Sequence, residues 1–170
     1  SIWTRTLISS KADRYIAKLF SVSTNVPRFL ESFPDAKILY MVRDPLSVIP
    51  SGLSLVTGVL DKRFGFWSLP EERRTHFINR LYKALIELQV RFVTDWNSGA
   101  IDRERVMLVH FDDLMQNFDS LISEIVEFVD HKPDSTMIAD IEETAKKQRE
   151  FKSKHQYDLS KFGLSEEQIK

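Results

Sequence analysis

The stretch from Phe33 to Ser51, FPDAKILYMVRDPLSVIPS, most limits what this chain can fold into. Its segment Lys37–Val42 is a short apolar run rich in β-formers, which predicts a buried strand. Helix-start signals follow the strand at once, because Asp44 suits an N-cap and Pro45 suits the first helical position. A strand that leads directly into a helix is typical of α/β folds with parallel strands.

This arrangement makes Arg43 a candidate ligand for an anion. Arg43 follows the strand, at the edge of an open α/β sheet where ligands bind, and it lies beside a helix N-terminus that favours negative charge. Ser51 comes eight residues later, about two helical turns on. A guanidinium fork and a hydroxyl together suit a phosphate. The alternative is a surface pair of Arg43 with Asp44 and an ordinary helical serine, and the spacing alone leaves both open.

Composition narrows the class of protein. The 170 residues predict a single domain, and a net charge of −1 argues against broad nucleic-acid binding. No apolar run approaches the roughly 18 residues of a membrane span, and no signal-peptide pattern is found. The chain has no cysteine, which excludes disulfides, a thiol nucleophile and a thiolate zinc site, and no metal site is expected. These features fit a cytoplasmic protein.

The rest of the chain predicts an α/β fold with a parallel sheet flanked by helices. Its strands are expected at Ile2–Ser9, Lys37–Val42 and Val106–Phe111. Helices are expected at Ala12–Phe20, Pro27–Ser32, 45–56, Ser68–Gly99, Phe118–Val129 and Asp134–Arg149. Pro50 is expected to kink its helix or to limit the first segment, and Thr57-Gly58 to end it.

The longest expected helix has clear boundary signals and one apolar stripe. Ser68 and Glu71 have the spacing of a capping box, and Gly99 suits the C-terminal end. The stripe is expected to be core; its members are Phe77, Leu81, Leu85, Leu88, Phe92 and Trp96. Lys62–Trp67 is expected to be a loop that covers either a substrate pocket or simply the core.

Three segments resemble the sulfotransferases that use 3′-phosphoadenosine 5′-phosphosulfate (PAPS). Phe33–Ser51 is similar to their 3′-phosphate-binding segment, a strand followed by Arg-Asp/Asn-Pro and a serine eight residues after the arginine. Arg105–Leu114, RVMLVHFDDL, is similar to a later strand with its aromatic–acid–Asp–Leu turn. His155–Ile169, HQYDLSKFGLSEEQI, resembles the C-terminal region of the bacterial-type branch.

The resemblance implies a P-loop kinase-like sulfotransferase fold and roles for several residues. Arg43 and Ser51 would hold the 3′-phosphate of PAPS, and Phe111 would take the place of the aromatic residue, more often tyrosine, at the adenine. The alternative is that Phe111 has no contact with the nucleotide and is a core residue at the end of a strand. Asp112 and Asp113 are interpreted as helix-capping residues rather than as a catalytic pair.

Further roles lie outside the two strands. Lys11 would contact the transferred sulfonyl group, although its distance in sequence from Arg43 exceeds what the bacterial-type branch leads us to expect; the alternative is a solvated lysine. Lys154 and Tyr157 would close over the nucleotide, and His155 is a candidate base, with a solvated basic loop as the alternative.

The implied function is transfer of a sulfonyl group from PAPS to a hydroxyl or amine of a small-molecule, lipid or carbohydrate acceptor. Adenosine 3′,5′-bisphosphate would be the other product. No segment resembles the Gly-rich loop that cradles the 5′-phosphosulfate, so the sequence is expected to be a single domain, residues 1–170, truncated at its N-terminus. That absence leaves open a non-catalytic domain that binds the bisphosphate or serves as a scaffold.

Overall fold

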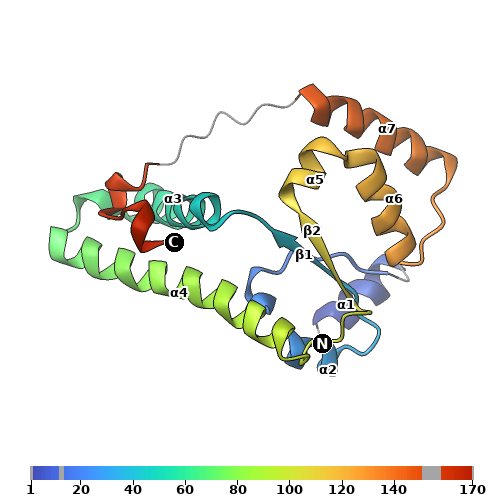
Figure 1. The fold of residues 1–170 in the computed structure, drawn as a ribbon, viewed down its shortest axis with the longest axis horizontal. Coiled ribbons are helices and arrows are strands. Elements are labelled where there is room, and N and C mark those ends of the chain that lie inside the picture. Colours follow the sequence, from blue (N-terminus) through green and yellow to red (C-terminus); the bar gives the residue numbers. More distant parts are fainter. Residues whose placement is uncertain (1, 12–13, 151–157, 170) are drawn as a thin grey trace.

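The computed structural model describes residues 2–11, 14–150 and 158–169. A parallel sheet of two strands, β1 (Ile38–Val42) and β2 (Val106–His110), lies between two groups of helices (Figure 1). The helices are α1 (Ile2–Ser10), α2 (Val26–Ser32), α3 (Pro45–Phe64), α4 (Glu71–Asn97), α5 (Phe111–Gln116), α6 (Phe118–Phe128) and α7 (Ser135–Glu150). Short 3-10 turns occur at Phe20–Thr24, Phe66–Ser68, Ser160–Phe162 and Glu166–Gln168.

The two strands confirm the strongest sequence predictions. They pair in parallel with Ile38 opposite Val106 and Val42 opposite His110, so both end at the same edge of the sheet. Parallel strands need a long crossover, which α3 and α4 supply. Residues 43–47 and 111–112, which follow the two strands, are therefore brought together at that edge.

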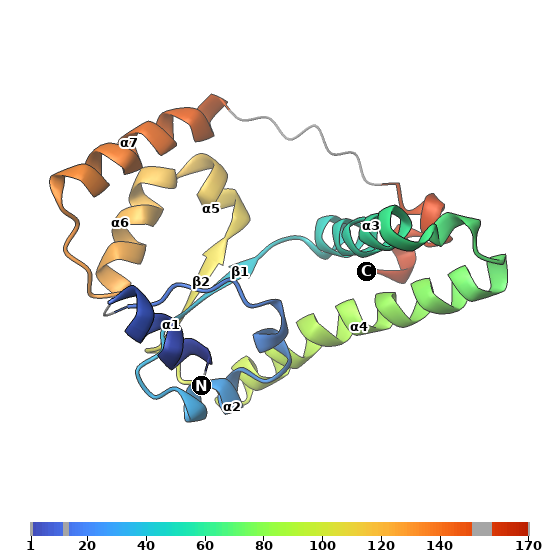
Figure 2. The ribbon, with the colours of Figure 1, turned by 180° about the vertical axis from the view of Figure 1, so that it is seen from behind.

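Helix α4 holds the fold together because it contributes to two separate parts of the core. Between its first turns and its middle, Ile78 and Leu85 pack with Leu53 of α3 and with Phe162 near the end of the chain. Further along, the buried Phe92 packs with α2 and the sheet, and its ring stacks on Tyr40 of β1. Figures 1 and 2 show α3 and α4 side by side, with α5, α6 and α7 grouped on the other side of the strands. The apolar stripe predicted for α4 is core, as expected.

The expected strand at Ile2–Ser9 is wrong, because these residues form α1. The hydroxyls of Ser9 and Ser10 donate to the carbonyl of Thr6, at 3.1 and 2.8 Å. A helix pairs its own backbone groups, whereas a strand needs the edge of a neighbour. The expected helix at Ala12–Phe20 is also wrong in its described part, since residues 14–19 have no regular structure.

Helix α3 continues past both of its expected stop signals. Pro50 is fully buried within it, and the buried hydroxyl of Thr57 donates to the carbonyl of Leu53 at 2.7 Å, so neither residue ends the helix. The helix ends where Gly65 adopts a left-handed conformation with φ 64°. Glycine accepts that conformation without a steric penalty. The segment Lys62–Trp67 is thus the last turn of α3, its cap and part of a 3-10 turn, not a loop.

Two capping predictions are wrong, and others are confirmed. The Ser68 hydroxyl donates to the Gly65 carbonyl at 2.6 Å and does not cap α4, which begins after Pro70. Asp112 and Asp113 lie inside the first turn of α5, where carboxylates complement the helix dipole. Asp44 caps α3 as predicted, and a further capping box lies near the C-terminus, where the Ser165 N–H donates to Gln168 Oε1 at 2.8 Å.

Candidate functional site at the ends of the two strands

The turn after β1 is built by Asp44. Its Oδ1 accepts a hydrogen bond from the Leu46 N–H at 3.0 Å, and its carbonyl accepts those of Ser47 and Val48 at 2.9 and 3.0 Å. Pro45 follows at the first helical position, where its missing N–H leaves nothing unpaired. The cap thus fixes the angle between strand and helix and leaves Arg43 at their junction.

The strand register brings Arg43 to Phe111. Val42 and His110 are partners, so the next residues of the two chains, Arg43 and Phe111, leave the sheet side by side. The guanidinium carbon of Arg43 lies 3.9 Å from the centroid of the Phe111 ring, a cation–π contact. Both side chains are half-buried. Within the described part of the chain, no carboxylate forms an ion pair with this guanidinium.

These residues surround a hollow of about 360 Å³. Its lining includes Arg43, Ser47, His110 and Phe111, together with the carboxylates of Asp44 and Asp112. One arginine and two carboxylates do not form a net positive cradle, although the Asp44 carboxylate is engaged by the N–H of Leu46. The arginine fork, a serine hydroxyl and the N-terminus of α3 nevertheless converge on one place, which suits a single phosphate group.

Ser47 is the serine that lines this hollow, and Ser51 is not. The two are four residues apart in α3, so they lie on one face of the helix a turn apart. The eight-residue spacing from Arg43 favoured Ser51, and it did not single out Ser47. Its position one turn from Ser51 on the same face was the signal that could have identified it.

A model of the sulfotransferase family matches residues 2–134, more than half of the chain. The chain belongs to the sulfotransferase family. No match was found among curated proteins or among solved structures. The match contains both strands of this sulfotransferase and the whole of the hollow between them.

Lys11 is not brought to the hollow of the sulfotransferase. It follows α1, and Arg14 three residues on donates to the carbonyls of Val129 and Asp130 at 2.6 and 2.9 Å. Asp130 in turn forms an ion pair with Lys37, whose Nζ lies 2.5 Å from Asp130 Oδ2. Lys37 is the residue just before β1. The segment after α1 therefore lies near the start of β1, whereas Arg43 follows its end.

The other predicted site residues, Lys154, His155 and Tyr157, lie outside the described residues. In the parts of the chain that are described, no cluster of three or more histidine, aspartate or glutamate side chains could hold a metal ion. Nor does any helix in those parts combine the length and the apolar character that a membrane crossing requires.

Proposed function

We propose that this sulfotransferase takes its sulfonyl group from PAPS and recognises that donor by its 3′-phosphate. One observation carries the proposal: the half-buried Arg43 guanidinium rests on the Phe111 ring, beside the N-terminus of α3, with no carboxylate paired to it in the described chain. A planar fork at a helix start is well suited to a phosphate dianion.

The neighbouring side chains would complete the phosphate site. Ser47 lines the hollow and Ser51 follows on the same face of α3, so each hydroxyl could donate a further hydrogen bond. Phe111 would hold the guanidinium in place with one face, and we propose that its edge or outer face packs near the adenine. Because Asp112 adds negative charge to the hollow, further cations are needed, and Lys154 is proposed as one of them, with Tyr157 as a hydrogen-bonding partner.

The proposed reaction breaks the bond between sulfur and the bridging phosphate oxygen and forms a bond from sulfur to an acceptor oxygen or nitrogen. The acceptor loses a proton, for which His155 is the proposed base, and adenosine 3′,5′-bisphosphate leaves. Charge builds up on the leaving oxygen, so cations and N–H donors held in place would lower the barrier. A sulfonyl contact by Lys11 stays a prediction, and it requires a different position from the one described. The proposed acceptor is a small molecule, a lipid or a carbohydrate.

Calorimetric titration with adenosine 3′,5′-bisphosphate tests the donor site, with 5′-AMP as the ligand control. We expect the bisphosphate to bind more tightly, and Arg43→Gln to remove about 2–4 kcal/mol of binding free energy, because hydrogen bonds to charged groups contribute about 1.5–3 kcal/mol each. Arg103→Gln is the matched control variant, since Arg103 also lies over an aromatic ring, that of Trp96 at 4.7 Å. Equal affinity of wild type and Arg43→Gln for the bisphosphate would remove the proposed anchor.

A further inference from the structure

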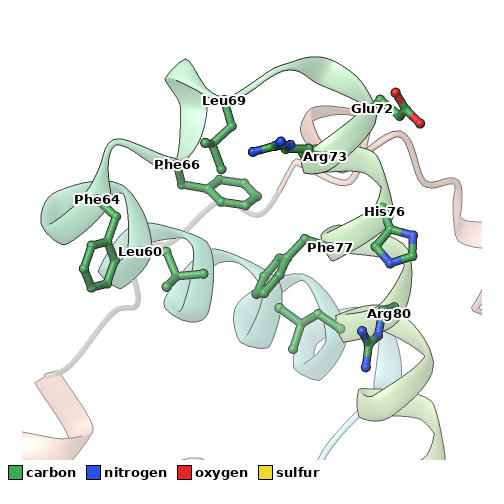
Figure 3. Close-up of a pocket in the computed structure, with 10 residues that line it drawn as sticks. Leu60, Phe64, Phe66, Leu69, Glu72, Arg73, His76, Phe77 and Arg80 are labelled. Atoms are coloured by element: carbon green, nitrogen blue, oxygen red, sulfur yellow. The ribbon is translucent and has the colours of Figure 1, made fainter.

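A second and larger hollow lies at the other end of α3. It has a volume of about 910 Å³, within the range of roughly 300–1,000 Å³ that is usual for small-molecule sites. Figure 3 shows it between the last turns of α3 and the first turns of α4. Since α3 is 20 residues long, about 30 Å separates its two ends, so this hollow is distinct from the one at Arg43.

The floor of this hollow is apolar and held in place. The buried Phe66 packs its ring against Phe77, with the ring centroids 5.4 Å apart in an edge-to-face arrangement. Leu60 of α3 completes the floor, and Phe64 at the rim has 76% of its surface exposed. An aromatic side chain so exposed beside a concave apolar floor offers area that a ligand can bury.

One wall of the hollow is formed by two arginines and a histidine of α4. Arg73, His76 and Arg80 are three and four residues apart, which places them on one face of the helix. None of the three side chains has an ion pair or a hydrogen bond in the described parts of the chain. In Figure 3 the Arg73 guanidinium extends toward Phe66 and Leu69, whereas the carboxylate of Glu72 points away from the middle of the hollow.

We propose that this hollow binds an anionic amphiphile with a single alkyl chain, a carboxylate of the fatty-acid type. The apolar floor would bury the alkyl chain, and Arg73 and Arg80, in the first three turns of α4, would attract the carboxylate. A concave site of this volume is of the kind that small molecules occupy. The inference does not depend on the donor site, since it concerns other residues and another end of α3.

The probes are octanoate, decanoate and decyltrimethylammonium, titrated calorimetrically below the concentrations at which they form micelles. We expect decanoate to bind more tightly than octanoate, by up to about fifteen-fold, because it has two more methylenes and each, when fully buried, strengthens binding about four-fold. We expect decyltrimethylammonium to bind at least about five-fold more weakly than decanoate, because its charge is repelled by the same arginines. Equal binding of the two decyl compounds, or no binding of decanoate, would overturn the proposal.

Single variants with matched controls locate the site. Arg80→Gln should weaken decanoate binding about three-fold, and Lys83→Gln, which removes an exposed cation of α4 outside the hollow, should leave it unchanged. Phe64→Ala should weaken it as well, whereas Phe20→Ala, at another exposed phenylalanine, should not. If each variant binds decanoate as its control does, the amphiphile binds elsewhere and the proposal fails.

A second copy of the chain is the competing occupant. Sedimentation of wild type and Phe64→Ala distinguishes the two cases. A monomer in both supports the small-molecule site. A dimer that Phe64→Ala dissociates would show that this face binds another copy, and would overturn the proposal.

Discussion

The Arg43 guanidinium and the Phe111 ring, 3.9 Å apart, link the ends of the two strands of this sulfotransferase. The contact follows from the register, because the residues just before them, Val42 and His110, are partners in the sheet. The contact holds the Arg43 side chain, which we propose binds the phosphate, in one orientation before any phosphate is present. Such preorganisation strengthens binding because less side-chain freedom is lost.

We expect Phe111→Leu to weaken binding of adenosine 3′,5′-bisphosphate by at least about two- to five-fold, since a cation–π contact contributes about 0.5–1 kcal/mol even at an exposed site. Phe111→Tyr keeps the ring and should bind as the wild type does. Calorimetry measures both, and thermal unfolding checks that the variants stay folded. A Phe111→Leu protein with wild-type affinity would show that the ring does not orient Arg43.

The serines of α3 give a second prediction. Ser47→Ala should weaken bisphosphate binding, because this hydroxyl lines the hollow. The expected loss is about five-fold, since one hydrogen bond contributes about 1 kcal/mol. Ser54→Ala, a serine of the same helix outside the hollow, is the control. A loss in Ser51→Ala equal to that in Ser47→Ala would mean that the phosphate is held by both turns; a loss in Ser51→Ala alone would contradict the place given to Ser47.

Two glycines of α3 should respond in opposite directions to the same substitution. A Cβ on Gly52 would lie 2.9 Å from Cδ1 of the buried Leu85, so Gly52→Ala should lower the free energy of unfolding by about 1 kcal/mol. A Cβ on Gly58 would meet nothing within 4 Å, so Gly58→Ala should raise it by about 0.5–1 kcal/mol through helix propensity. Urea unfolding measures both. Equal stabilisation by the two changes would indicate that Leu85 moves aside at little cost.

The ion pair of Asp130 with Lys37 gives a pH dependence. The hydrogen bond from Lys37, and then its charge, lower the pKa of the Asp130 carboxyl below its ordinary value of 3.8. The charged carboxylate is thus favoured in the folded state, and its contribution to stability is present above the ordinary pKa. The contribution is lost as the pH falls through the lowered value.

Thermal unfolding of Asp130→Asn between pH 2 and pH 6 tests whether the charge of Asp130 stabilises the fold. Asparagine also tolerates the left-handed backbone found at Asp130, where φ is 50°, so the substitution mainly removes the charge. We expect the difference in melting temperature from wild type to be largest near pH 6 and to shrink in acid. Asp140→Asn, at an exposed aspartate of α7 with no ion pair in the described chain, should show no such trend. A difference that stays constant with pH would rule out the charge effect.

Local signals in the sequence determined both strands, the Asp44-Pro45 helix start and the core stripe of α4. Each depends on neighbouring residues alone: a run of β-formers, a capping side chain, or apolar residues at helical spacing. The place of Arg43 at the end of a strand followed directly. So did the core role of Phe92 and Leu85, which are buried as the stripe predicted.

Only the tertiary structure decided features that depend on distant partners. Ile2–Ser10 forms a helix that does not join the described two-stranded sheet, and α3 continues to Phe64 because burial of Pro50 and Thr57 outweighs their local cost. The pairing of Arg43 with Phe111, and the lining of the hollow by Ser47, depend on the strand register. Register arises from backbone hydrogen bonds between segments far apart in sequence, so local composition does not fix it.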